Sequence, residues 1–551
     1  MASKNEDARV DTIAGKVDAA GVSSAQRRQL HKTIWSIADE LRGAVDGWEF
    51  KSYVLGMLFY RYISENLTAY VNAGEEEAGA PDFDYAQLDD ETAEGARQGI
   101  VDEKGYFILP SQLFANVVAR APHDDNLNEA LSAVFRAIEG SAVGTQSEDD
   151  MRGLFQDVDV NSPRLGPTVM DRNKKLTAVL QKIAELPLSV NSETSRTDLF
   201  GDAYEYLIHM YAANGGKSGG EFFTPPEVGA LLARIATIGK TSANKVYDPA
   251  CGSGGLLLAV QRLLGDENVG KGLYGQEINL TIYNLARMNM FLHNVGFNQF
   301  DLRLGDTLIH PQHVDDEPFE VIVSNPPYST KWVGSANPEL ITDPRFSPAG
   351  VLAPKSKADL AFTMHMISWL AENGTAAIVE FPGVLYRGGA EKKIRTYLLD
   401  SNYVDAVIQL PPDLFFGTTI ATCILVLKKS KPDDTVMFIN ASELFTRSGN
   451  KNTMTPEHQT RVIDALKSRE PEQYFSAVVH RSDIANREDN LSVSAYVETK
   501  STREEINIDE LNSRIDRIVA REQELRQRID DIVDALERSS SCCDLSKERS
   551  K

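Results

Sequence analysis

The segment "IVSNPPYST" (322–330) sets an amide, two prolines and an aromatic ring directly after an apolar run. Pro326 and Pro327 cannot join a strand ladder and hold the backbone extended, so we expect the strand to end at Asn325. This rigid backbone would aim the Asn325 amide oxygen and the Pro326 carbonyl at one point, where both hydrogens of an exocyclic amino group could be accepted. The Tyr328 ring would offer a flipped base a face for stacking. The segment therefore predicts a site for an –NH2 substrate, with catalysis by positioning and polarisation.

A glycine-rich turn upstream predicts a ligand-binding loop. The stretch "VYDPACGSGGLLL" (246–258) reads as a strand, a tight turn and the start of a helix. Gly252, Gly254 and Gly255 would let the backbone approach a ligand closely, and the helix N-terminus would favour a negative group. The stretch has neither the glycine spacing of a dinucleotide fingerprint nor the lysine of a P-loop.

Three acids stand at the ends of three successive expected strands. Asp248 ends the first, where a carboxylate suits a cationic ammonium or sulfonium group. Glu277 ends the second and could accept hydrogen bonds from ribose hydroxyls, and Asp306 ends the third and could meet an adenine amino group. Together they predict a nucleoside that carries an amino acid, a description that S-adenosylmethionine fits.

Alternating strand and helix patterns from about residue 244 must position these groups. Apolar runs predict seven strands, at 245–248, 272–277, 302–306, 319–325, 375–381, 404–410 and 422–429. Helical patterns separate the first strands, whereas only a loop separates the last two. The sequence therefore predicts an α/β fold with a seven-stranded, mostly parallel sheet whose last strand is antiparallel. The motifs would then meet at the carboxyl edge of this sheet.

Helical patterns flank this region on both sides. Apolar residues repeat at helical spacing first over 30–41 and then after Gly47, in the set Phe50, Tyr53, Val54, Met57 and Leu58. The polar stretch "SVNSETSRTD" (189–198) reads as a linker. We therefore expect a disordered tail at 1–25, a helical domain at 26–190, a catalytic domain at 191–485 and a C-terminal helical segment at 486–551.

The C-terminal segment carries a heptad pattern with Glu522 as its one break. Its apolar members are Ile508, Leu511, Ile515, Ile518, Leu525, Ile529, Ile532 and Leu536. Sustained over about four heptads, this pattern predicts a coiled-coil seam. The alternative is a helix packed on its own domain.

The amino-acid composition limits which partners this chain can bind. The chain has 57 basic and 80 acidic residues, a net charge of −23, so it should repel nucleic acid unless a local basic surface or a partner supplies the contacts. No apolar run is long enough for a membrane span, and the polar start predicts no signal peptide. The four cysteines show no metal spacing and suit a reducing cytoplasm. "HPQH" (310–313) is the nearest approach to a metal pair, and we expect no metal.

These motifs resemble a known family. "DPACGSGG" (248–255) followed by "NPPY" (325–328) resembles the amino-methyltransferases, and "GKSGGEFFTPPEV" (216–228) resembles the cofactor segment that precedes the glycine-rich loop in the gamma-type order. "DLFGDAYEYLI" (198–208), the helical stretch at 30–67, "RGGAEKKIR" (387–395), "LFFGTTIAT" (414–422) and "NLSVSAYVE" (490–498) are similar to the modification (M) subunit of type I restriction–modification systems, IC-like in type. The resemblance covers roughly residues 28 to 537.

The resemblance implies the S-adenosylmethionine-dependent methyltransferase fold and N6-adenine methylation of double-stranded DNA, with no metal. The catalytic residues would be Asn325, Pro326, Pro327 and Tyr328. The cofactor would touch Glu221, Phe222, Phe223, Thr224, Pro225, Pro226, Ser253, Gly254, Gly255 and Glu277, with Asp248 and Asp306 as further contacts. Phe416, or else Phe415, would supply a second stacking face.

The family also implies partners. Two M subunits join one specificity (S) subunit, which reads the DNA sequence, and a restriction (R) subunit adds ATP-dependent cleavage. The C-terminal heptads would bind the S subunit, and the N-terminal helical domain would close over DNA. Basic residues after the catalytic segment could meet phosphates, although solvated charge is the alternative: Lys331, Lys355, Lys357, Arg387, Lys392, Lys393 and Arg395.

Three other functions fit parts of the pattern. A protein-glutamine methyltransferase also binds an amide NH2 with Asn-Pro-Pro-Tyr, but the helical flanks argue against it. An N4-cytosine methyltransferase more often carries serine where Asn325 stands. A non-catalytic assembly subunit would keep cofactor binding alone, against which the intact catalytic segment speaks.

Overall fold

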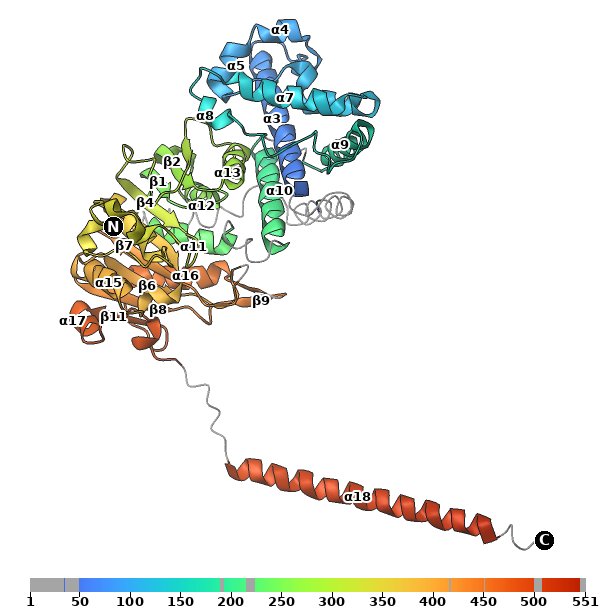
Figure 1. Cartoon of the computed structure of the whole chain (residues 1–551), viewed down its shortest axis with the longest axis vertical. Helices are drawn as coiled ribbons and strands as arrows, with labels where there is room; N and C mark the ends of the chain where they lie inside the picture. The colour runs from blue at the N-terminus through green and yellow to red at the C-terminus, as the bar shows by residue number, and fades with distance from the viewer. Residues whose placement is uncertain are drawn as a thin grey trace. The chain divides into compact units, whose positions relative to one another are not determined.

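The computed structural model describes residues 34, 49–188, 193–214, 223–415, 418–449, 451–499 and 508–545 (Figure 1). The chain divides into two compact units, one ending at Glu498 and one spanning Thr499–Lys551. The predicted tail at 1–25 lies outside the described residues. The predicted boundaries at 190 and 485 stay predictions.

All seven predicted strands are present. They are β1 (Ala243–Asp248), β2 (Val269–Glu277), β3 (Phe300–Leu304), β4 (Phe319–Ser324), β5 (Leu370–Glu380), β6 (Val404–Gln409) and β7 (Cys423–Lys428). Strand β7 pairs antiparallel with both β5 and β6, which confirms the predicted antiparallel last strand. The chain runs outward from β1 through β2 to β3 and in the other direction from β4 to β5, so β1 and β4 flank a switch point, where open α/β sheets bind ligands.

The sheet is larger than predicted. It has nine strands in the order β11-β8-β6-β7-β5-β4-β1-β2-β3, because β8 (Thr435–Asn440) pairs parallel with β6 and β11 (Ser476–His480) pairs antiparallel with β8. Phe438 of β8 stacks on Tyr496 with ring centroids 4.2 Å apart. Tyr496, which covers β8, thus comes from far along the chain, and the local sequence around β8 does not indicate this contact. A separate two-stranded sheet contains β9 (Thr446–Ser448) and β10 (Lys451–Thr453).

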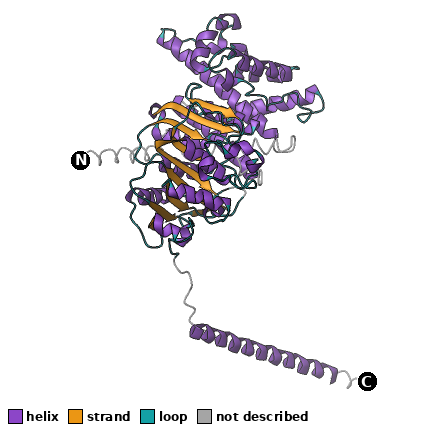
Figure 2. Cartoon of the chain, turned by 60° about the vertical axis from the view of Figure 1, so that its left-hand side comes forward, coloured by secondary structure: helices purple, strands orange, loops and turns teal. Residues whose placement is uncertain are grey.

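Helices cover both faces of the large sheet (Figure 2). One core contains apolar residues of α11 (Pro226–Ala236), α12 (Gly255–Leu264), α13 (Leu280–Leu292) and α16 (Pro456–Ser468), and the other contains residues of α14 (Asp359–Trp369) and α15 (Ala390–Asp400). Val246 belongs to the first core and Tyr247 to the second, as the alternation of a strand requires. A short helix, α17, spans Arg481–Ala485.

The N-terminal region is helical, as predicted. Its helices are α3 (Glu49–Glu77), α4 (Asp90–Glu94), α5 (Arg97–Lys104), α6 (Phe114–Arg120), α7 (Leu127–Ser141), α8 (Glu148–Met151) and α9 (Val169–Ala184). The predicted apolar face of α3 is buried at Tyr53, Val54, Met57 and Leu58. The linker predicted at 189–198 is wrong in its second half, because α10 (Glu193–Asn214) begins there and packs on both α3 and α13.

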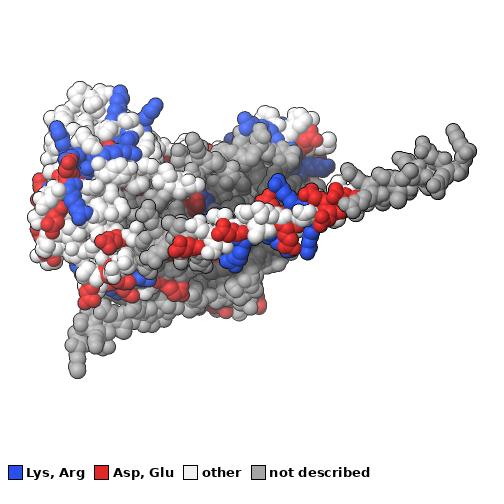
Figure 3. Space-filling model, turned by 90° about the horizontal axis from the view of Figure 1, so that it is seen from below, with Lys and Arg blue, Asp and Glu red and all other residues white. Residues whose placement is uncertain are grey.

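The second unit contains one long helix, α18 (Ile508–Leu545), in which residues 511–535 are all exposed. The heptad side chains of this stretch are 46–61% exposed: Leu511, Ile515, Ile518, Leu525, Ile529 and Ile532. Acidic and basic side chains alternate along the same helix (Figure 3). Both interpretations of this heptad pattern, a coiled-coil seam and a helix packed on its own domain, stay predictions. Among the described helices, none has both the length and the apolar character needed to cross a membrane.

Candidate active site

A cavity of about 300 Å³ lies at the carboxyl edge of β1 and β4. It brings together three of the predicted motifs, because its lining includes Phe223, Thr224, Pro226, Asp248, Ser253, Gly255 and Asn325. The motifs meet because β1 and β4 are paired, with Tyr247 opposite Ile322, and both strands end at this edge. Glu221 and Phe222 lie outside the described residues. Pro225 precedes α11, and its fixed backbone helps to start that helix.

The glycine-rich turn has the backbone geometry that its sequence predicts. Gly252 and Gly254 have φ of +53° and +80°, values that side chains disfavour. A Cβ on Gly254 would stand 2.6 Å from the Met290 methyl carbon. Asn289 donates from Nδ2 to the Ser253 carbonyl at 2.9 Å, and thereby ties the turn to α13. The turn is held in a shape that only glycine permits.

Asp248 is buried at the base of the cavity, 1% exposed. Its Oδ1 accepts from the Ala250 amide at 3.0 Å and from the Ser324 hydroxyl at 2.8 Å. Its Oδ2 has no hydrogen-bond partner among the described residues. Burial raises the pKa of Asp248 to about 7. A buried acceptor without a partner favours a ligand that brings a donor or a positive charge.

Glu277 and Asp306 are not among the residues that line the cavity. The Glu277 carboxylate accepts from the Gly252 amide at 3.1 Å and the Asn279 amide at 2.8 Å, so it connects the glycine-rich turn to the end of β2. Burial raises the pKa of Glu277. Asp306 accepts from the Leu308 amide at 3.0 Å within its own turn. Their assignment to ribose and adenine stays a prediction.

Asn325 is held from both ends of its amide. Its Nδ2 donates to Thr224 Oγ1 at 3.0 Å, and its Oδ1 accepts from the Tyr328 hydroxyl at 2.6 Å. The amide oxygen therefore already faces a donor, in the position where a substrate amine would donate. The Thr224 contact orients the side chain, and no sequence pattern linked these two residues.

The Tyr328 ring contacts Phe415 edge-on, with centroids 6.2 Å apart and an interplanar angle of 83°. Phe415 is 2% exposed and packs behind Tyr328, and its assignment to the second stacking face stays a prediction. Phe416, the other residue predicted for that face, lies outside the described residues. Burial raises the pKa of the Tyr328 hydroxyl well above its usual value, which keeps it protonated as a donor.

One of the predicted phosphate contacts is wrong. Arg395 is 2% exposed and donates to the carbonyls of Val384, Arg387 and Asp489, so it fastens the chain inside the domain. Lys331, Lys355 and Lys393 are exposed. Lys392 pairs with Glu488 at 3.1 Å.

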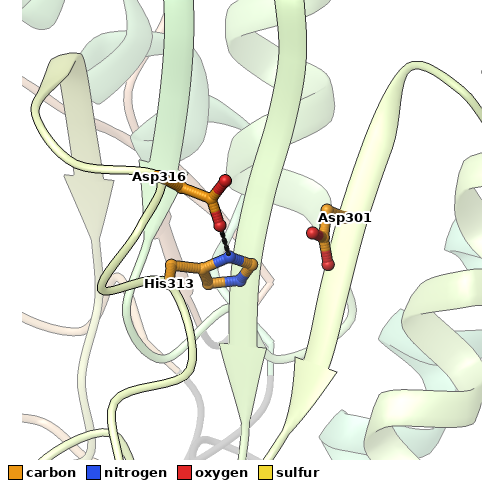
Figure 4. Close-up of side chains that lie close together, drawn as sticks. All are labelled: Asp301, His313 and Asp316. Atoms are coloured by element: carbon orange, nitrogen blue, oxygen red, sulfur yellow. Dashed lines mark hydrogen bonds and ion pairs between the residues drawn. The ribbon is translucent and has the colours of Figure 1, made fainter.

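The "HPQH" segment contributes to a polar cluster of Asp301, His313 and Asp316 (Figure 4). His313 Nδ1 lies 2.9 Å from Asp316 Oδ2, and its Nε2 lies 3.0 Å from the Gly275 carbonyl. Arg303 donates to both oxygens of Asp301. Each of the three side chains offers one ligand atom within 4.8 Å of the others, so the cluster could hold a metal ion, and the expectation of no metal stays a prediction. This cluster ties the loop after β3 to β2.

A further cluster that the sequence did not reveal lies at the other end of the cavity. Glu205 of α10 pairs with Arg262 of α12 at 2.6 Å and with His293 at 3.2 Å, and Glu205 and Arg262 both line the cavity. Burial opposes ionisation, but Arg262 and His293 hold the pKa of Glu205 at about 2. Gly201 is a sequence feature that could have pointed to this cluster, because a Cβ at that position would collide with the His293 ring.

Comparisons with known proteins agree with this architecture. A family model described as N-6 DNA Methylase matches residues 195–505, and one described as HsdM N-terminal domain matches residues 30–183. The MpnII type I restriction enzyme methylase subunit of Mycoplasma pneumoniae is 47% identical over 524 residues, which cover 92% of this chain and 96% of that protein. The MjaIX methylase subunit of Methanocaldococcus jannaschii is 25% identical over 92% of this chain and 91% of its own length.

A solved structure is similar over the same region. The methyltransferase subunit of a type I restriction–modification system from Streptococcus thermophilus has a TM-score of 0.77 and 38% identity, over 86% of this chain and 100% of that one. The α/β fold predicted from the strand pattern, and the methyltransferase fold that the family resemblance implied, are therefore confirmed. The chain belongs to the N-6 DNA methylase family and, within it, to the methyltransferase subunits of type I restriction–modification systems.

Proposed function

We propose that this chain transfers the methyl group of S-adenosylmethionine to the N6 amino group of a flipped adenine in double-stranded DNA. A separate S subunit would supply the sequence specificity, two M subunits would join it, and an R subunit would complete the restriction complex. The observation that carries the proposal is the Asn325 amide, oriented by Thr224 at a cavity that also contains the unpartnered oxygen of Asp248.

The residues present fit the proposed cofactor. Asp248 offers a buried acceptor to its ammonium or sulfonium end, and Gly252, Ser253 and Gly255 of the glycine-rich turn line the cavity at the start of α12. The cofactor supplies an electrophilic methyl group on a positively charged sulfur.

The chain's own residues then orient the amine. With the target adenine flipped, N6 would donate to Asn325 Oδ1 and to the Pro326 carbonyl, and the tyrosine hydroxyl would yield its place on Oδ1. Both hydrogens being bound, the nitrogen lone pair points away from these acceptors and towards the methyl group. Tyr328 would stack on the base, with Phe415 behind it.

Methyl transfer with and without the neighbouring subunit tests this function. The tritiated methyl group of S-adenosylmethionine is followed into genomic DNA that lacks adenine methylation, and the product nucleoside is identified. N6-methyladenine made only by the complex is the expected result. Methyl groups on protein, or N4-methylcytosine, would replace the proposal with one of the alternative substrates, and activity of the chain alone would show that it reads DNA itself.

Gly254→Ala is expected to weaken S-adenosylmethionine binding at least about tenfold, because the residue at φ +80° would be strained and its Cβ would displace Met290. Isothermal titration calorimetry on the purified chain measures this. Gly350→Ala is the matched control: it has φ of +65° but nothing within 4 Å of the added carbon and lies outside the cavity lining. Equal affinities for the two variants would contradict the role of the turn.

Two substitutions separate the functions of Tyr328. Tyr328→Ala removes the stacking face and is expected to lower the transfer rate by about ten- to one-hundred-fold. Tyr328→Phe keeps the ring and frees Asn325 Oδ1, so its rate is expected to stay within about tenfold of wild type. Single-turnover methylation by the complex measures both. An equal loss in the two variants would mean that the hydroxyl, and not the ring, matters.

A further inference from the structure

Two buried acids lie behind the Asn-Pro-Pro-Tyr segment. Asp359 begins α14 and is 2% exposed, and Glu380 ends β5 and is 1% exposed. Strand β5 pairs parallel with β4, with Ser324 opposite Ile378, so Glu380 reaches the same edge as the residues that follow Ser324. Neither acid lines the cavity, and the chemistry described above uses neither.

Asp359 holds the backbone directly after Tyr328. Its Oδ1 accepts from the Ser329 amide at 3.0 Å. Ser329 has φ of +51°, the left-handed region that a residue with a Cβ adopts only when its surroundings hold it there. This conformation sets the direction in which the chain leaves the Tyr328 ring. The carboxylate thus fixes the turn that presents the ring.

The second buried acid, Glu380, accepts a side-chain hydroxyl where Asp359 accepts a backbone amide. Its Oε1 accepts from the Thr363 hydroxyl at 2.6 Å, whereas Glu380 Oε2 and Asp359 Oδ2 have no partner among the described residues. Burial, and next the charge of Asp359, raise the pKa of Glu380 well above its usual value, and Glu391 adds to this. Both causes disfavour the charged form of the Glu380 side chain.

We infer that Asp359 is a positioning residue for methyl transfer, which acts through the backbone that follows Tyr328. The chain of contacts runs from Asp359 through the Ser329 amide to the Tyr328 ring, whose hydroxyl reaches Asn325 Oδ1. The assignment rests on the proposed function for its effect on rate, but the structural contact can be tested without it.

Asp359→Ala is expected to lower the single-turnover rate of the M–S complex by about ten- to one-hundred-fold, because the Ser329 amide loses its acceptor and the turn after Tyr328 loses its support. The affinity for S-adenosylmethionine is expected to stay within about threefold, since Asp359 is outside the cavity. Asp359→Asn keeps an acceptor for the Ser329 amide and should restore most of the rate.

Asp433→Ala is the matched control. Asp433 also accepts a backbone amide, that of Thr435 at 2.9 Å, but in the turn before β8. It is expected to leave the rate unchanged. Wild-type rates in Asp359→Ala would overturn the inference while leaving the proposed function intact. A loss of cofactor affinity equal to the loss of rate would also overturn it, because the residue would then support the fold alone.

Hydrogen exchange followed by mass spectrometry keeps the inference testable if the wild-type complex transfers no methyl group. Peptides covering 325–331 should exchange faster in Asp359→Ala than in wild type, with peptides from the remote control region unchanged. Unchanged exchange at 325–331 would overturn the inference. If the wild-type complex transfers no methyl group but residues 325–331 exchange faster in Asp359→Ala, the proposed function would be wrong and the positioning contact would be supported.

Discussion

Asn325→Ala is expected to lower methyl transfer by about 10²- to 10³-fold or more, while the affinity for S-adenosylmethionine stays within a few-fold of wild type. The substitution removes the oxygen that now accepts the Tyr328 hydroxyl and leaves the Pro326 carbonyl as the only acceptor for the substrate amine. It also removes the contact with Thr224, which is a smaller change because the threonine hydroxyl remains accessible from the cavity. Single-turnover methylation by the M–S complex gives the rate, and calorimetry gives the affinity.

Asn337→Ala is the control for this substitution. The Asn337 side chain accepts from the Glu339 amide at 3.1 Å and begins a short helical turn away from the cavity lining. Its activity should equal that of wild type. Two results for Asn325→Ala would count against the catalytic assignment: full activity, which would indicate the assembly function, and lost cofactor binding, which would make the residue part of the cavity's support.

Removal of residues 505–551 is expected to abolish association with the S subunit and to leave the melting temperature of the remaining chain unchanged. The first compact unit ends at Glu498, so the deletion removes only the second. Burying the heptad side chains of α18 against a partner would gain roughly 1.5–3 kcal/mol for each fully covered residue, a sum that no surface salt bridge replaces. Co-purification of tagged subunits and thermal unfolding test the two parts.

A point variant makes the same test without a deletion. Ile515 and Ile529 are 49% and 59% exposed, and replacing both by Asp would place charges in the predicted seam. Gln527→Ala, on the same helix but outside the heptad pattern, is the control and should bind normally. Binding by the double variant would show that the S subunit contacts another surface. An insoluble truncated chain would mean that the two units do not fold separately.

The sequence by itself determined the local features of this protein. Apolar runs defined seven strands because a strand buried on both faces must be apolar throughout, and the prolines after Asn325 fixed where β4 stops. The sequence indicated a tight turn at Gly252 and Gly254 because glycine tolerates the positive φ that this turn requires. The same patterns did not assign β8 to the sheet, although its run at 436–439 is apolar, and they indicated a linker at the polar start of α10, whose packing partners α3 and α13 lie elsewhere in the chain.

The tertiary structure alone decided which side chains cooperate. Thr224 and Asn325 are 101 positions apart, and Ser329 and Asp359 are 30 apart, so neither contact leaves a periodic trace in the sequence. Burial decided the chemistry as well. Arg395 has the charge that a phosphate contact needs, but its side chain is buried. Burial also raises the pKa of Asp248. Residue type and spacing specify what a side chain can do, and the solvent and neighbours that determine whether it does so are set only when the chain packs.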